Sequence, residues 1–186
     1  MPNIGNAAVK VWDPLVRVSH WLSVALVATA WLTHHGPSAL HDGAGYALLA
    51  LIAVRVVWGK VGSRHARFAG FLRSPRETWN YARAILGGRE RRYLGHNPLG
   101  GWMIVGLLLT LAAACISGWL YTTDAFWGVL WVERLHRFSA VLVLVLAALH
   151  VAGVVFTSIR QRENLAAAMV HGRKAPADDA PAGPPP

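Results

Sequence analysis

Four apolar runs dominate the sequence, and each is long enough to cross a lipid bilayer. They cover residues of about 14–34, 39–59, 100–121 and 132–157. A transmembrane helix needs about 20 predominantly apolar residues, because the hydrocarbon core is about 30 Å thick and a helix rises about 1.5 Å per residue. The pattern therefore predicts an all-α integral membrane protein, a bundle of four helices that lies in the lipid bilayer.

The 18 lysines and arginines are distributed unevenly between the ends of these runs. Sixteen lie on the side that holds the N-terminus, the segment 60–99 and the C-terminus, and only Arg134 and Arg137 lie on the other side. Basic segments stay in the cytoplasm, so both termini are predicted to be cytoplasmic. The net charge of +9 is thus a topology signal. Because the basic residues form no nucleic-acid-binding motif, nucleic acid is not expected as a partner.

The single cysteine and the first apolar run narrow the protein class further. Cys115 stands alone, which excludes an intrachain disulfide and any cysteine-based zinc or iron–sulfur site. The first run follows Trp12, Asp13 and Pro14 and lacks a small-residue cleavage site, so we expect it to remain as a helix. Asp13 can cap the first turn, and Pro14 suits its first position.

The segment between the second and third runs contains a shorter helical pattern over about 75–87. Ser74, Pro75 and Glu77 match a capping box with proline at the first helical position, and Gly87 can end the helix. The pattern predicts either an amphipathic helix on the inner membrane surface or a solvated connector. We expect residues 1–174 to form one membrane domain and the Pro/Ala-rich tail 175–186 to be disordered.

The fourth run carries a histidine near each end, which is unusual for a membrane helix. Fourteen residues separate His136 from His150, so both project from nearly the same helix face, about 21 Å apart along the axis. His20, near the inner end of the first run, is level with His150. His41 begins the second run at the outer end and is level with His136.

These four histidines form two pairs matched in depth, which predicts two bis-imidazole sites. Haem iron takes axial imidazole ligands, and helical bundles build cofactor sites from side chains on facing helices. We therefore expect two b-type haems, one between His20 and His150 and the other between His41 and His136. Zinc fits less well, because two imidazoles at each depth leave too few ligands for a closed tetrahedral site.

Other interpretations of the histidines remain open. A histidine in a membrane helix often only bonds one helix to another. His34 and His35, where the first helix emerges, could compete for a ligand role at the outer end. The remaining histidines fall in loops or the tail, and no special role is predicted for them; they are His65, His96 and His171.

Several residues near the four histidines could contact a cofactor. Arg17, Arg55 and Arg137 could each pair with a haem propionate through a charge-assisted bond, although an arginine at a helix end can also simply reach the interface. Gly45 lies four residues after His41 on the same face, where the missing side chain would let a porphyrin approach.

With these residues placed, the chain resembles bacterial cytochrome b561, the four-helix, two-haem family that includes the cytochrome b subunits of nickel–iron hydrogenases. The resemblance covers about residues 10–174. It rests on the order and spacing of five stretches, which are VWDPLVRVSHW (11–21), LHDGAGYALLALIAVRVVWG (40–59), GHNPLGGWM (95–103), LHRFSAVLVLVLAALH (135–150) and RENLAAAMVHGRK (162–174). The family's ligands fall on His20, His41, His136 and His150.

The resemblance implies electron transfer between the quinone pool and a periplasmic c-type cytochrome or redox enzyme subunit, in the bacterial inner membrane. Quinol oxidoreductase activity would accompany this role, quinone being expected beside the inner haem near Arg17, Trp12 and Arg55. A second copy of the chain is a further candidate partner. Three rival functions are a haem-free membrane anchor of a redox complex, a transporter or proton channel, and a reductase of a small acceptor such as superoxide or oxidised iron.

Overall fold

The computed structural model describes residues 9–35 and 38–174. The helices in these residues are α1 (Pro14–Leu32), α2 (Ser38–Val61), α3 (Phe68–Phe71), α4 (Pro75–Leu86), α5 (Pro98–Tyr121), α6 (Leu130–Gln161) and α7 (Leu165–His171), and the strands are β1 (Val9–Lys10) and β2 (Arg173–Lys174). The tail 175–186, predicted to be disordered, lies outside the described residues.

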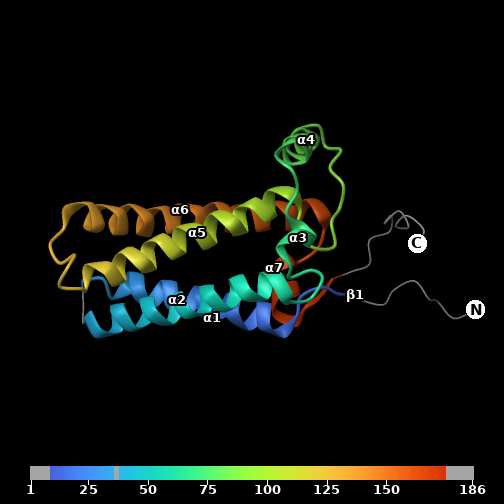
Figure 1. Cartoon of the computed structure of the whole chain (residues 1–186). Coiled ribbons are helices and arrows are strands. Elements are labelled where there is room, and N and C mark those ends of the chain that lie inside the picture. Colours follow the sequence, from blue (N-terminus) through green and yellow to red (C-terminus); the bar gives the residue numbers. More distant parts are fainter. Residues whose placement is uncertain (1–8, 36–37, 175–186) are drawn as a thin grey trace, which may run out of the picture.

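The four long helices α1, α2, α5 and α6 lie side by side and form the body of the molecule (Figure 1). All four are long and apolar enough to cross a membrane, which confirms the predicted fold class. The main backbone contacts join α1 to α2, α2 to α5 and α5 to α6. Helix α6 makes its main backbone contacts with α5, so its contacts with α1 and α2 are made mainly by side chains.

The long helices begin and end close to the predicted residues, and α6 differs most. It continues to Gln161, four residues beyond the apolar run, and then stops at Arg162 in a left-handed conformation with φ of 49°. Helix hydrogen bonds need no apolar side chains, so a helix can continue past the membrane until its backbone turns. Its 32 residues span about 48 Å at about 1.5 Å per residue, more than the hydrocarbon core of a bilayer needs.

Two predicted helix starts are confirmed in atomic detail. Asp13 Oδ1 accepts the backbone N–H of Val16 at 2.9 Å, with Pro14 in the first turn of α1. At α4, Ser74 Oγ accepts from the Glu77 backbone at 3.2 Å, and Glu77 Oε2 accepts from the Ser74 backbone at 3.0 Å. Both caps satisfy backbone donors that have no partner inside the helix.

The short elements gather at one end of the bundle, which also holds both ends of the described chain (Figure 1). We call it the terminal end, and the opposite end, where residues 122–129 join α5 to α6, the loop end. The sequence did not predict α3, α7 or the strand pair. In that pair Val9 lies opposite Lys174 and Lys10 opposite Arg173, so the first and last described residues are hydrogen-bonded together.

Asp13 also joins α1 to the end of α2. Its Oδ2 accepts hydrogen bonds from Trp58 Nε1 at 3.0 Å and from Ser63 Oγ at 2.5 Å. Partial burial raises the pKa of Asp13, but these hydrogen bonds and the nearby Arg55 charge outweigh it and lower the pKa overall. The carboxylate is therefore held ionised where the two helices meet.

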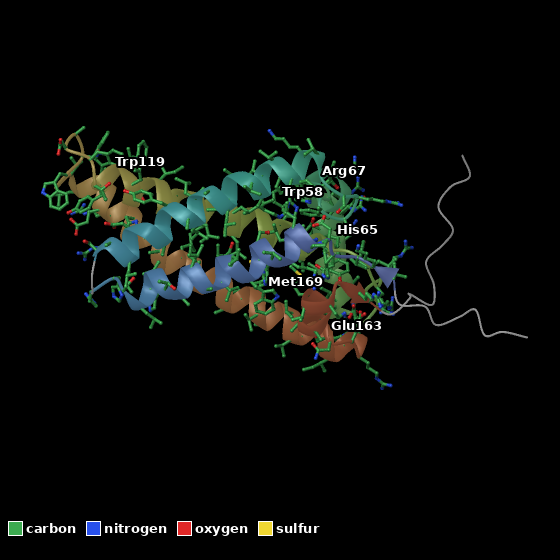
Figure 2. The ribbon with its side chains drawn as sticks, turned by 90° about the horizontal axis from the view of Figure 1, so that it is seen from below. Trp58, His65, Arg67, Trp119, Glu163 and Met169 are labelled. Carbon is green, nitrogen blue, oxygen red and sulfur yellow. The ribbon has the colours of Figure 1, made fainter. Side chains whose placement is uncertain are left out.

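Ion pairs attach the loop before α5 to the region around the end of α6. Arg160 binds Glu90 through two contacts of 2.8 Å, from Nε and from Nη2. Arg92 binds Glu163 at 3.0 Å. Figure 2 shows Glu163 at the terminal end with Trp58 and His65, whereas Trp119 lies at the loop end. Indole side chains thus occur at both ends, as expected for aromatic belts at the two membrane interfaces.

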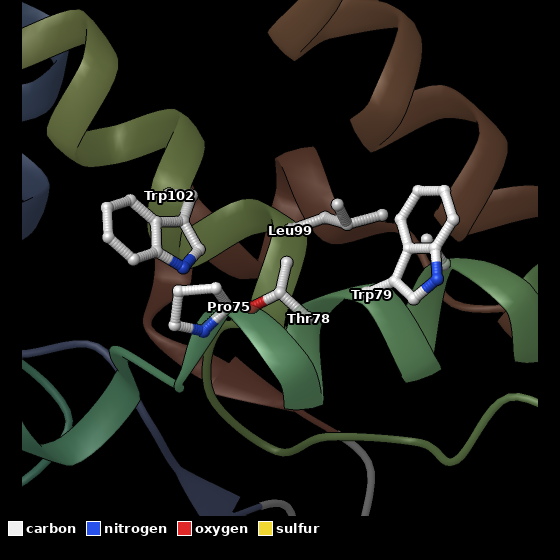
Figure 3. Close-up of a pocket in the computed structure, with 6 residues that line it drawn as sticks. Pro75, Thr78, Trp79, Leu99 and Trp102 are labelled. Atoms are coloured by element: carbon white, nitrogen blue, oxygen red, sulfur yellow. The ribbon is translucent and has the colours of Figure 1, made fainter.

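An open apolar groove of about 460 Å³ lies between α4 and the first turn of α5 (Figure 3). Its lining residues are Pro75, Thr78, Trp79, Ala82, Leu99 and Trp102. Trp102 Nε1 donates to the backbone oxygen of Arg73 at 3.2 Å, and the Arg83 guanidinium lies 5.2 Å from the Trp79 ring centroid. Helix α4 therefore presents the exposed Trp79 indole together with the Arg83 guanidinium.

Candidate cofactor site

Two pairs of histidine rings join α6 to α1 and to α2. The centroids of the His20 and His150 rings are 6.3 Å apart, with 59° between their planes. Those of His41 and His136 are 6.0 Å apart, with 79° between their planes. The structure thus brings together the same partners that depth along the helices had predicted.

The spacing within each pair fits a single haem iron. Two imidazole nitrogens bound to one iron from opposite sides stand about 4 Å apart, and each ring centre lies about 1 Å behind its nitrogen, which gives about 6 Å between ring centres. The two observed distances match this spacing. Within residues 9–35 and 38–174, no cluster of three or more His, Cys, Asp or Glu side chains could hold a metal ion.

The pair near the loop end is held by backbone carbonyls. His41 Nδ1 donates to Ala30 O, and His136 Nδ1 donates to Ala114 O, each at 2.9 Å. A metal-binding histidine usually donates its second ring N–H in this way, which fixes the tautomer and the ring orientation. Both hydrogen bonds leave Nε2 as the nitrogen that can bind iron.

Glycines provide space around the same pair. A β-carbon at Gly118 would lie 3.0 Å from His136 Cε1, so glycine lets this ring lie against α5 without being displaced. At Gly45, one turn after His41, a β-carbon would meet no atom within 4 Å. The role of Gly45 in admitting a flat cofactor stays a prediction.

The arginines predicted to bind propionates have different surroundings. Arg137 is largely exposed and pairs with Glu133 at 2.8 Å. Arg55 Nη1 donates to Ala66 O at 3.2 Å, and its guanidinium lies 5.4 Å from the Phe68 ring centroid. Arg17 donates through Nη2 to Val170 O in α7. The propionate role of each arginine stays a prediction.

The alternative ligands near the loop end pack with each other. The His34 ring stacks on Trp31, with centroids 5.1 Å apart and 23° between the planes. His35 lies next to His34, with ring centroids 3.9 Å apart. These contacts account for the placement of both rings, and their role as ligands stays open.

His96 is the residue that sequence reasoning overlooked. Its ring packs against Trp12 at 4.5 Å and Phe71 at 4.9 Å between centroids. Burial, and after it the positive charges of Arg55 and Lys174, lower the pKa of His96 to about 3. In the sequence this histidine stands in a polar loop without helical periodicity, so no local pattern indicated that it packs inside the terminal end.

Comparison with known proteins identifies the family of the chain. The sequence model of the prokaryotic cytochrome b561 family matches residues 11–172. Three similar curated proteins are each named probable Ni/Fe-hydrogenase B-type cytochrome subunit. That of Bradyrhizobium diazoefficiens is 22% identical, with 92% of this chain and 87% of the relative aligned.

The other two relatives are similarly distant and similarly complete. The protein of Rhizobium leguminosarum bv. viciae is 24% identical over 92% of this chain and 90% of its own length. That of Azotobacter vinelandii is 24% identical over 95% of this chain and 92% of its own length. No solved structure shows significant similarity. Since the family model covers nearly the whole described chain, the protein belongs to the prokaryotic cytochrome b561 family.

Proposed function

We propose that this protein is a di-haem b-type cytochrome that carries electrons between membrane quinone and a redox partner on the periplasmic side. Its family and the names of its relatives support haem b electron transfer in a membrane. The number of haems, the quinone and the partner are the parts that we add.

The observation that carries the proposal is the presence of two imidazole pairs at two depths of one helix. The ring spacing in both pairs would let the two imidazoles hold a single haem iron. Their α6 members, His136 and His150, are separated by 14 residues, or about 21 Å along the axis. Two sites at this separation would form an electron path along most of the bilayer thickness.

A b-type haem supplies a one-electron couple at its iron when it is bound. The chain's own residues would hold, orient and insulate that group. His20 and His150 would bind the haem at the terminal end, and His41 and His136 the haem at the loop end. Residues 141–149, entirely aliphatic, would keep water and ions from the space between them.

Quinone exchange is proposed at the terminal end. Trp12 is buried there beside His96, and Arg17 and Arg55 belong to the same end of α1 and α2. A quinone that gains two electrons also takes up two protons, so its site needs access to water at the membrane surface.

Arg17, Arg55 and Arg137 are proposed to pair with haem propionates.

The redox partner is proposed to bind at the loop end. The acidic side chains there are Asp42, Asp124 and Glu133, which suit a basic surface such as that of a small c-type cytochrome. The relatives' names make a hydrogenase subunit an equally concrete candidate. We propose that the bundle lies in the bacterial inner membrane with both termini in the cytoplasm, because the terminal end carries the basic residues.

Anaerobic stopped-flow reduction by quinol tests this function. Purified protein should contain two haems per chain, and adding a short-chain quinol should reduce them with a b-type absorption change. A protein that folds but contains no haem would instead support the membrane-anchor function. Haem that dithionite reduces but quinol does not would contradict quinone as the electron source, and superoxide or oxidised iron would then be tested as direct acceptors.

A further inference from the structure

Two nitrogen atoms at the terminal end are shielded from solvent and have no hydrogen-bond partner among the described residues. They are Arg17 Nε and His96 Nδ1. An unpaired polar atom shielded from water is costly to the fold, so such atoms are rare and call for a specific explanation. A third such atom, Gln161 Oε1 at the end of α6, is an acceptor, so the two nitrogens are the donors that indicate a ligand.

The chemistry of Arg17 sets what this ligand must offer. A guanidinium nitrogen can only donate a hydrogen bond, so the missing group is an acceptor. Its Nη2 already donates to Val170 O in α7, so the acceptor for Nε must come from another group. The neutral His96 ring can donate from Nδ1 to the same kind of acceptor.

Arg17 and His96 belong to one connected cluster. The His96 ring lies 4.5 Å from the Trp12 ring between centroids. Gly172 lies against both residues. A β-carbon added to it would be 2.9 Å from Trp12 O and 3.1 Å from Arg17 Nη1. Gly172, with φ of 82°, therefore lets the chain after α7 close over Trp12 and Arg17.

The same cluster lies beside the His20–His150 pair. Arg17 precedes His20 by three residues in α1, so the two side chains leave neighbouring positions on one helix face. His96 lies near enough to His150 for the two rings to interact electrostatically. Each unpaired nitrogen thus belongs to a residue near one member of this histidine pair.

Charge decides between an anionic and a neutral acceptor. Arg55 and Lys174 place positive charge near His96, and Lys174 lies 4.0 Å from Glu163, which also pairs with Arg92. Asp13 interacts with Arg55, but its oxygens already accept from Val16, Trp58 and Ser63. A carboxylate would neutralise the remaining positive charge, whereas a quinone carbonyl would not.

We propose that Arg17 Nε and His96 Nδ1 together bind one propionate of the haem held by His20 and His150. The inference rests on the proposed di-haem function and adds His96 as a positioning residue. Losing one of these donors would leave the propionate charge less compensated. The ferric state would then be favoured, and the midpoint potential of that haem would fall.

Potentiometric titration of the purified holoprotein, with quinone removed, tests the proposal. The variants are His96→Leu, His96→Gln and Arg17→Gln, and His171→Gln, at an exposed position of α7, is the matched control. His96→Leu and Arg17→Gln should lower the midpoint potential of the same haem, the one lost in His20→Ala. His96→Gln retains an amide donor and should stay closer to the wild-type potential.

The outcomes separate this inference from the function on which it rests. Wild-type protein without haem would overturn the proposed function itself. Two retained haems with unchanged potentials in His96→Leu and Arg17→Gln would overturn only the propionate contact. A change confined to quinol reduction rates, with both potentials unchanged, would assign the two nitrogens to quinone and overturn the proposal. A shift in the propionate bands of redox infrared difference spectra in His96→Gln would support it even if His96→Leu failed to fold.

Discussion

The His136 ring lies directly against the backbone of Gly118. A β-carbon at that glycine would be 3.0 Å from His136 Cε1 and 3.1 Å from its Nδ1. The same Nδ1 donates to Ala114 O, one turn earlier in α5. Helix α5 therefore provides both the space and the acceptor that orient an imidazole belonging to α6.

Gly118→Ala is expected to disturb the haem at the loop end selectively. The added methyl group would push the His136 ring away from α5 by a small distance and weaken its hydrogen bond to Ala114, because a contact of 3.0 Å is tighter than ordinary van der Waals contact. We expect loss of one of the two haems, measured by pyridine haemochrome content. Gly106→Ala is the matched control in the same helix, since its β-carbon would meet only Leu146 Cδ1, at 4.0 Å. Equal haem content in both variants would show that the ring does not need this space.

Asp13→Ala is expected to destabilise the protein by about 1–2 kcal/mol, because it removes a helix cap and leaves Trp58 Nε1 without an acceptor. Thermal unfolding in detergent measures the effect. Asp13→Asn keeps an oxygen that can cap α1, so this variant should lose less stability than Asp13→Ala. A wild-type melting temperature in Asp13→Ala would mean that the carboxylate does not hold α1 to α2.

The stability difference between the wild-type protein and the Asp13→Asn variant should depend on pH. The pKa of Asp13 is lowered in the folded state, so its charged form stabilises the fold above the unfolded-state pKa of about 3.9. That stability is lost as the pH falls through the folded-state pKa. The melting temperatures of the two proteins should therefore converge below about pH 4. A difference that stays constant down to acidic pH would show that the charge of this carboxylate contributes nothing.

Arg162→Gly is expected to stabilise the protein by about 0.5–1 kcal/mol. Arg162 ends α6 with φ of 49°, in the left-handed region that glycine adopts without a β-carbon penalty. Its side chain is exposed, so little packing is lost. The comparison variant is Gln161→Gly, which places glycine inside the last helical turn and should lower stability. A lower melting temperature in Arg162→Gly would contradict this account of the helix end.

The fluorescence of Trp79 can show whether α4 lies on the membrane surface. Its side chain is 60% exposed beside the apolar groove, and Arg83 lies over its ring. In vesicles containing brominated lipid, part of the tryptophan fluorescence should be quenched, and Trp79→Phe should reduce that quenched part. Trp12→Phe, which removes a buried indole, serves as the control. Quenching unchanged in Trp79→Phe would indicate a solvated connector.

The sequence predicted the four long helices because a membrane span has a strong signature in length and apolar content. It also predicted the imidazole pairs, since His136 and His150 lie in one regular helix whose geometry fixes their face and separation. The caps at Asp13 and Ser74 were predictable for a similar reason, because a cap depends on residues only three positions apart.

The terminal end could not be predicted in the same way. His96 packs between Trp12 and Phe71, residues far from it in the sequence that come together only in the folded chain. The pairing of Val9 with Lys174 likewise joins the two ends of the described chain through backbone atoms, which leaves no periodic signal in so short a strand. The roles of Arg17, Arg55 and Arg137 depend on the cofactor itself, so spacing alone could not establish them.

The most direct test of the account is the haem content of four single variants, His20→Ala, His41→Ala, His136→Ala and His150→Ala. Each should retain one haem of the wild-type two, and low-temperature spectra should identify which one is lost. We predict that His20→Ala and His150→Ala lose the same haem and that His41→Ala and His136→Ala lose the other. Loss of a haem in His34→Ala or His35→Ala, with both haems retained in His41→Ala, would contradict the pairing.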